Sequence, residues 1–399
     1  MRILQIANKF PYPAKDGGSI ATLNLSRALS SQGHQVTVLA INTSKHYTDP
    51  ATVPSELSDA IRFISVAVNT DIRILSLIRN FLYSSLPYNA ERFISKEFDQ
   101  TLKNLLTAEK FDIIQLEGLY LAPYLETIRA HSTAKVIMRA HNIEHEIWER
   151  TATLTKGLKK WYIKSLAGRI RRMEMQYLNR YDALLPITAR DGDLLLKLGC
   201  HLPSHVLPMG VDTGELHPDH SRLEFPSVFH IGALDWMPNQ EGLLWFFENV
   251  WGKILEKHPD LLFYLAGRNA PPQFRVLPYP NVVFTGEVEN AYDFIRSKAV
   301  MIVPVLSGSG MRIKIIEGMA LGKAIVTTSI GTEGIATTHG SDIFISDDPE
   351  EFARHVCTLV ENRNFYLKIG ENASKFVKSR YDNFIITSSL ADFFQKLIR

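Results

Sequence analysis

Short apolar runs alternate along the chain with stretches whose apolar positions recur at helical spacing. Residues 2–7 have the length and composition of a buried strand, and a loop with two prolines and a Gly-Gly pair follows at 8–18. Apolar residues then recur every three to four positions over 20–32, which predicts an amphipathic helix. The next apolar run, 35–41, predicts a second strand. This strand–loop–helix–strand order is a βαβ unit, which implies a parallel sheet.

The alternation continues through most of the chain and starts a second βαβ series after residue 208. The pattern therefore predicts an α/β protein with two Rossmann-like, doubly wound domains that face a cleft. We expect a first domain at 1–204, a second domain at 205–378, and a C-terminal helix at 379–399 that packs back on the first domain. Further strands are expected at 112–117, 135–140, 182–187, 227–231, 261–266, 282–285, 299–303 and 324–328.

Composition narrows the class of protein. A chain of 399 residues exceeds what one hydrophobic core usually supports, which agrees with two domains. Lys and Arg number 44 and Asp and Glu 42, and the resulting net charge of +2 is too balanced for general nucleic-acid binding. Cys200 and Cys357 are far apart and form no CxxC pair. No apolar run resembles a signal peptide or a membrane-spanning helix, so we expect a cytoplasmic protein.

The strongest local signal is a glycine-rich loop between a buried strand and a helix at 304–321. Gly308, Ser309 and Gly310 form the loop. Glycines let a backbone approach a ligand, and free N–H groups at a helix start favour an anion such as a diphosphate. Arg312 and Lys314 follow in the expected first turn, where cations oppose the helix dipole unless an anion lies among them. A solvated helix with surface charges is the alternative.

The stretch Gly308-Ser309-Gly310-Met311-Arg312-Ile313-Lys314-Ile315-Ile316-Glu317, followed by Gly331-Thr332-Glu333-Gly334, resembles the donor motif of glycosyltransferase family 4. The resemblance covers nearly the whole chain and implies the GT-B fold and a reaction that retains anomeric configuration. Three other segments match family motifs in the same order: Arg139-Ala140-His141-Asn142-Ile143-Glu144, Pro208-Met209-Gly210-Val211-Asp212, and Gly232-Ala233-Leu234-Asp235-Trp236-Met237-Pro238-Asn239.

The resemblance implies that 1–204 is the acceptor-side domain and 205–378 the nucleotide-sugar-binding domain. It also implies roles for individual residues in the second domain. Glu317 would bind the donor ribose, and Gly232 and Met311 would line the donor site. Ser309 stands where many members have a glutamate that touches the donor sugar, which leaves the sugar open. Members also hold the diphosphate with an Arg and a Lys, where this chain has Ala233 and Gln240 or Glu241. The candidates that replace them are Arg312, Lys314 and Arg268. Arg268 follows Gly267 at a strand end.

In the first domain, the resemblance places Gly17 and Gly18 near the donor diphosphate and the acceptor. It places His141 at the transferring sugar, where we assign it a catalytic role beside Arg312 and Lys314. His141-Asn142-Ile143-Glu144-His145 also fits the H-x-x-E-H pattern of some zinc peptidases. That zinc site needs both histidines on one helical face, whereas His141 directly follows a strand.

Two acidic pairs fit helix starts better than they fit a metal site. Asp191-Gly192-Asp193 begins a helix after Thr188, where acidic residues suit the dipole, and Asp348 precedes Pro349 as an expected N-cap. We therefore expect an enzyme that needs no metal and no cofactor beyond a nucleoside diphosphate sugar as co-substrate.

A basic stretch with interleaved aromatic and aliphatic residues lies at 156–173. Such a helix can rest on an anionic bilayer, which would suit a lipid-linked acceptor at the inner face of the membrane. A solvated helix with one side on the core accounts for the pattern equally well. The partners that we expect are a nucleotide-sugar donor and a saccharide or lipid-linked acceptor, with no nucleic acid.

These features predict a retaining glycosyltransferase that moves a sugar from a nucleoside diphosphate to a hydroxyl acceptor, in synthesis of cell-surface polysaccharide or glycolipid. One alternative is a nucleotide-sugar epimerase of the same fold, which would convert the donor without an acceptor. The other is a non-catalytic nucleotide-sugar-binding subunit, which Ser309 keeps open because it replaces a carboxylate.

Overall fold

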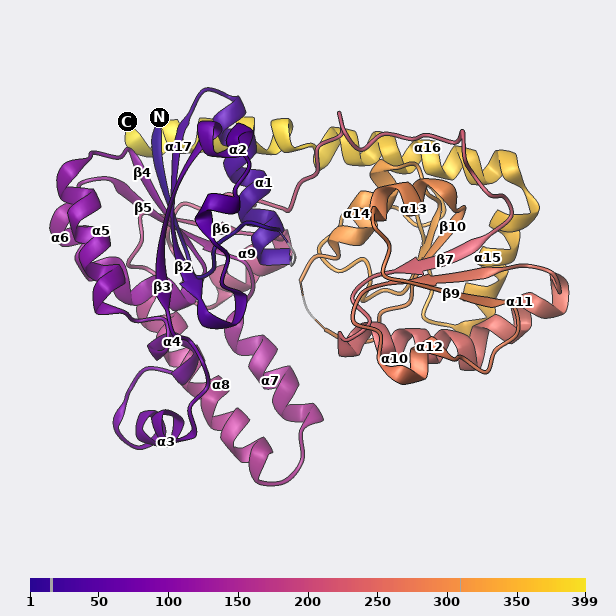
Figure 1. Ribbon diagram of the computed structural model, residues 1–399, viewed down its shortest axis with the longest axis horizontal. Coiled ribbons are helices and arrows are strands. Elements are labelled where there is room, and N and C mark those ends of the chain that lie inside the picture. The colour runs from indigo at the N-terminus through magenta and orange to yellow at the C-terminus, as the bar shows by residue number, and fades with distance from the viewer. Residues whose placement is uncertain (15–16, 309) are drawn as a thin grey trace. The chain divides into compact units, whose positions relative to one another are not determined.

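The computed structural model describes residues 1–14, 17–308 and 310–399, without the side chains of residues 154 and 158. The chain forms two compact units: unit 1 comprises Met1–Pro208 with Ile386–Arg399, and unit 2 comprises Met209–Ile385. Each unit holds a six-stranded parallel sheet with helices, so the prediction of two Rossmann-like α/β domains is confirmed (Figure 1).

Unit 1 has the strand order β3-β2-β1-β4-β5-β6. Its strands are β1 (Arg2–Ala7), β2 (Gln35–Thr43), β3 (Ile61–Val68), β4 (Ile113–Glu117), β5 (Lys135–Ala140) and β6 (Ala183–Pro186). Its helices are α1 (Gly17–Ser31), α2 (Ser55–Ala60), α3 (Ile74–Tyr83), α4 (Tyr88–Glu91), α5 (Lys96–Ala108), α6 (Leu125–His131), α7 (Glu144–Leu154), α8 (Gly157–Tyr177) and α9 (Ala189–Lys197), with most of α17 (Asn383–Ile398).

The strands of unit 1 other than the edge strand β3 are buried on both faces, because apolar residues occupy alternate and intervening positions. Leu4 and Ile6 belong to the core cluster that α5, α6 and α8 cover. Ile3 points to the other face, where Leu25 and Leu29 of α1 pack together with Ile386, Leu390 and Phe394 of α17. Segments from the two ends of the sequence therefore complete one layer.

Unit 2 has the strand order β12-β11-β10-β7-β8-β9. Its strands are β7 (Val228–Ile231), β8 (Phe263–Ala266), β9 (Val282–Gly286), β10 (Val300–Val303), β11 (Ile325–Thr327) and β12 (Phe344–Ile345). Its helices are α10 (Met237–Phe246), α11 (Gly252–Lys257), α12 (Pro272–Arg275), α13 (Ala291–Ser297), α14 (Ile313–Ala320), α15 (Pro349–Glu361) and α16 (Arg363–Arg380), and a π-helical turn, Phe247–Trp251, joins α10 to α11.

The core of unit 2 is aromatic-rich. Phe246, Trp251 and Phe263 are almost fully buried, and their ring centroids lie 5.4 to 6.0 Å apart. Aromatic pairs at this separation add to the stabilisation from buried area alone. The core fixes α10 against the sheet, and α10 in turn carries side chains of the site described next.

Candidate active site

The strand order of unit 2 identifies where a ligand fits. β7 and β10 are neighbours, but the chain leaves β7 toward β8 and leaves β10 toward β11 on the opposite side. Loops diverge at such a switch point, and ligands of open α/β sheets bind beyond the carboxyl ends of the two strands. Gly232 follows β7 directly, and the loop that contains Gly308 and Gly310 follows β10. The sequence-predicted donor residues of unit 2 therefore gather largely at one switch point.

Lys314 is the central cation of this site. It lies in the first turn of α14, and its Nζ donates to Asn239 Oδ1 at 2.9 Å and lies 3.5 Å from His230 Nε2. His230 Nδ1 is 3.0 Å from the carbonyl oxygen of Ile302, so it carries the proton and leaves Nε2 as an acceptor. Burial, then the charge of Lys314, hold the pKa of His230 well below its usual range. The imidazole is thus a neutral partner of the ammonium group.

The ammonium group is itself easy to deprotonate. Burial lowers the pKa of Lys314 to about 7, and the nearby charge of Arg312 contributes. An anion placed beside such a group favours the charged form and raises its pKa again. The position of Lys314, buried and beside another cation, is therefore suited to a negatively charged ligand.

Gly232 leaves space beside Lys314. A Cβ atom at this position would lie 2.8 Å from Lys314 Nζ and 3.0 Å from Asn239 Nδ2. Real Cβ contacts are longer, so any larger residue would displace the ammonium group from Asn239. The glycine is therefore required by the position of Lys314, in addition to any approach of a ligand.

Arg312 is not within the helix, as the sequence had suggested, but is the N-cap of α14, which begins at Ile313. Its guanidinium donates to the carbonyl oxygens of Gly310 and Ser307 and lies 5.5 Å from the ring of Trp236. A Cβ at Gly308, where φ is +102°, would lie 3.2 Å from Arg312 Nη2. Arg312 is 5% exposed and therefore shapes the loop from within.

Glu317 lies on the same helix, one turn beyond Lys314. Its Oε1 accepts a hydrogen bond from the hydroxyl of Tyr292 at 3.0 Å. Burial raises the pKa of this carboxyl to about 7, against the opposing effects of Tyr292 and Lys314. Met311 is buried beside the loop, while Ser309 lies outside the described residues.

Arg268 lies beyond β8, the strand next to β7 in the sheet. It follows β8 by two residues, is half-buried, and accepts a backbone hydrogen bond from Leu234 at 2.9 Å. Glu241, at one of the positions where a lysine was considered, accepts a hydrogen bond from Ser307 Oγ at 2.6 Å.

A second cluster lies at the switch point of unit 1, between β1 and β4. Glu117 ends β4, and its Oε2 lies 2.7 Å from His141 Nε2 and 3.4 Å from Arg139 Nη1. Arg139, then His141, hold the pKa of this buried carboxyl down at about 2 despite burial. The carboxylate fixes the ring of His141, which follows β5 as predicted. Gly17 and Gly18 are the first, exposed residues of α1, not loop residues.

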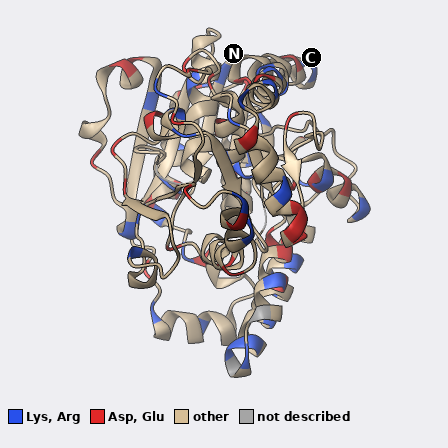
Figure 2. Ribbon diagram, turned by 90° about the vertical axis from the view of Figure 1, so that its right-hand side faces the viewer, with Lys and Arg blue, Asp and Glu red and all other residues tan. Residues whose placement is uncertain are grey.

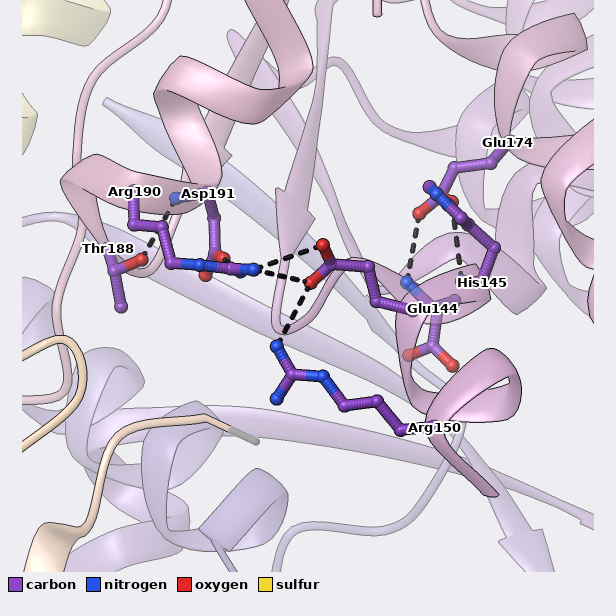
Figure 3. A network of polar contacts seen from close by, with 8 residues as sticks. Glu144, His145, Arg150, Glu174, Thr188, Arg190 and Asp191 are labelled. Carbon is purple, nitrogen blue, oxygen red and sulfur yellow. Dashed lines mark hydrogen bonds and ion pairs between the residues drawn. The ribbon is translucent and has the colours of Figure 1, made fainter. Parts of the chain in front are cut away.

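Neither metal pattern of the sequence forms a shared site. His141 contacts Glu117, whereas His145 contacts Glu174, so the two histidines bind different carboxylates. Figure 3 shows His145 beside Glu174. Asp191 accepts from Arg190, and its backbone N–H donates to Thr188 Oγ1 at 3.0 Å, as expected at a helix start. Across residues 1–14, 17–308 and 310–399, no group of three or more His, Cys, Asp or Glu side chains is arranged to hold a metal ion.

Sequence reasoning missed four residues of these clusters: His230, Asn239, Tyr292 and Glu117. Of these, Asn239 was named only as the last residue of the family motif at 232–239, without a role of its own. Each of the four approaches from a different element from the residue it contacts. Only the order of strands in the sheet brings these elements together, which a local pattern does not encode.

Comparison with protein families agrees with this geometry. The model described as Glycosyltransferase Family 4 matches residues 15–215, and the model described as Glycosyl transferases group 1 matches residues 225–362. The chain belongs to glycosyltransferase family 4. This glycosyltransferase is 26% identical to an uncharacterized 44.6 kDa protein in the cps region of Klebsiella pneumoniae, over 98% of each chain.

Solved structures share the fold of this glycosyltransferase at low sequence identity. HepE of Anabaena, solved with UDP, has a TM-score of 0.66 at 14% identity, over 99% of this chain and all of HepE. Sucrose-phosphate synthase of Thermosynechococcus elongatus has a TM-score of 0.69 at 14% identity, over 100% and 99% of the two chains. These similarities support two Rossmann-like domains of the GT-B type.

Proposed function

We propose that this glycosyltransferase moves a sugar from a nucleoside diphosphate to a hydroxyl acceptor with retention of anomeric configuration. Its product would be a cell-surface polysaccharide or glycolipid. The proposal rests on Lys314, a buried lysine with a pKa of about 7 at the switch point of unit 2. The HepE complexes with UDP and UDP-glucose favour uridine donors as first probes, and the relative in a cps region supports a role in polysaccharide synthesis.

Leaving-group stabilisation follows from the cluster around Lys314. As the bond from the anomeric carbon to the diphosphate breaks, negative charge grows on the phosphate oxygens. Lys314, the N–H groups around Gly310 and the loop ordered by Arg312 would meet this charge, with no need for a metal ion. Glu317 would accept hydrogen bonds from the ribose hydroxyls, and His141, oriented by Glu117, would contact the transferring sugar.

The first test is the affinity for UDP, measured by calorimetry for the wild type, Lys314→Met and the matched control Lys368→Met. Lys368 is exposed on α16. Because a charge-assisted hydrogen bond contributes about 1.5–3 kcal/mol, we expect Lys314→Met to weaken UDP binding by about tenfold to a hundredfold. Lys368→Met and an added chelator are expected to change nothing. Equal affinities for the wild type and Lys314→Met would contradict the donor site.

Transfer itself needs a separate readout. Incubation with UDP-glucose and saccharide or lipid-linked saccharide acceptors is expected to give a product whose anomeric coupling matches that of the donor. An epimerase would instead convert the donor sugar without an acceptor, and a binding subunit would leave the donor unchanged. Inverted anomeric coupling in the product would refute the retaining mechanism.

A further inference from the structure

Helix α3 in unit 1 is amphipathic, but it exposes its apolar face and buries a polar residue. Ile74, Ile78 and Leu82 recur at four-residue spacing and are all exposed, and Leu75 and Tyr83 beside them are 83% and 84% exposed. The polar Asn80, by contrast, is 1% exposed. A water-facing helix normally shows the reverse pattern. We call the surface of Ile74, Leu75, Ile78, Leu82 and Tyr83 the α3 face.

Buried hydrogen bonds hold α3 in this orientation. Asn80 Nδ2 donates to the carbonyl oxygen of Leu86 at 3.0 Å and to Glu91 at 2.6 Å. Arg169 of α8 donates to Asn80 Oδ1 at 3.0 Å and also to the carbonyl oxygens of Asn80, Ser84 and Leu86. Because buried polar groups are costly to leave unpaired, turning the helix to bury its apolar residues would break this network. The outward apolar face is thus a fixed feature of the fold.

The α3 face continues onto α8. Phe81 of α3 lies 5.4 Å from the ring of Trp161, which is itself 63% exposed. In Figure 1, α3 and the start of α8 lie together at the lower end of unit 1, away from its sheet. The five residues of the α3 face and Trp161 therefore form one apolar surface with an indole at its edge.

Exposed cations lie beside this surface. Residues 72–87 contain Arg73 and Arg79 and no acidic residue, and residues 156–173 contain seven cations and no acidic residue. Arg73, Arg79, Lys156 and Lys159 are exposed, and Arg79 lies 3.8 Å from Glu91. Lys160 and Lys164 instead line a groove on the α7 side of α8 together with Glu149. Figure 2 shows blue segments without red ones at the lowest end of the view. An exposed apolar helix with cations beside it and an aromatic edge has the chemistry that recognises an anionic lipid bilayer.

We propose that the α3 face and Trp161 insert into the headgroup region of an anionic membrane, with the exposed cations of α3 and α8 on the lipid phosphates. None of the described helices is long and apolar enough to span a bilayer, so the contact is peripheral. The sequence pattern indicated only the basic stretch at 156–173. The structure adds an apolar insertion surface on α3, which a solvated basic helix would not need. This inference does not depend on the transfer reaction.

The test is co-flotation of the full chain with phosphatidylcholine vesicles that contain either no anionic lipid or about 30 mol% phosphatidylglycerol, which gives an anionic surface. We expect binding to the anionic vesicles that weakens with salt. Leu75→Ser with Ile78→Ser is expected to lower the partition coefficient by about tenfold or more, since each side chain loses most of its apolar burial. Val276→Ser, which changes an 83% exposed residue of unit 2, is the matched control and is expected to bind like the wild type.

Two further measurements distinguish membrane insertion from misfolding and from self-association. Trp161 emission is expected to shift to shorter wavelength on anionic vesicles, and Trp161→Phe is expected to abolish most of that shift. The thermal unfolding transition of unit 1 in the double serine variant is expected to match that of the wild type, which shows that the mutated unit is folded. Absent vesicle binding by the wild type, or equal binding by the double serine variant, would overturn the proposal. Self-association through the α3 face without vesicle binding would overturn it as well.

Discussion

At the scale of single residues, Lys314 and Glu317 are unusual because each is held where its charged form is disfavoured. The pKa of Lys314 is lowered to about 7 and that of Glu317 is raised to about 7, in both cases mainly by burial. Buried ionisable groups with strongly shifted pKa values are typical of ligand-binding sites. The sequence predicted both residues because they lie within one loop-helix motif. It did not predict their partners His230 and Tyr292, which come from other elements.

The substitution Glu317→Gln tests the raised pKa of this carboxyl. The unfolded carboxyl ionises near pH 4.5 and the folded one near 7, so the wild type loses stability as pH rises through this interval. The amide cannot ionise. We therefore expect the variant to be about 1–2 kcal/mol more stable than the wild type at pH 8 and nearly equal at pH 5. Thermal melting at both pH values measures the difference, with the exposed Glu256→Gln as control. A pH-independent difference would contradict the raised pKa.

At the scale of elements, the sequence predicted most strands of both sheets, because parallel strands are continuous apolar runs. It missed β3, whose burial pattern is mixed, and β12, which has only two residues. Between β7 and β8 the structure has α10, a π-helical turn and α11. That turn keeps the same backbone direction, so apolar spacing alone does not reveal it.

The approach of α10 to the loop after β10 gives a prediction for a whole element. A Cβ at Gly242 would lie 1.8 Å from the carbonyl oxygen of Pro304, whereas a Cβ at Gly252 of α11 would meet nothing within 4 Å. Gly242→Ala is thus expected to push α10 away from the loop and destabilise unit 2 by about 1–3 kcal/mol, with weaker UDP binding. Gly252→Ala is expected to be neutral or stabilising. Chemical denaturation of both variants decides, and equal stabilities would show that α10 shifts freely.

At the scale of the molecule, unit 1 consists of two separate stretches of the chain, since Ile386–Arg399 belongs to it. Phe394 is fully buried in the layer with α1, whereas Phe384 on the same helix is 65% exposed. We expect Phe394→Ala to lower the free energy of unfolding of unit 1 by about 3–5 kcal/mol and Phe384→Ala to change it by less than about 0.5 kcal/mol. Differential scanning calorimetry can follow the affected transition. Equal effects of the two variants would mean that α17 does not support unit 1.

The shared layer of α1 and α17 also sets an order of events during synthesis. Unit 1 begins at Met1, yet one of its layers is completed by residues that the ribosome makes only after all of unit 2. The apolar positions around Leu25 and Leu29 therefore stay partly uncovered until Ile386 and the residues after it emerge, once the whole of Met209–Ile385 has been made. Nascent chains that stall before Ile386 would carry an incomplete first domain, which makes them natural clients for chaperones and proteases.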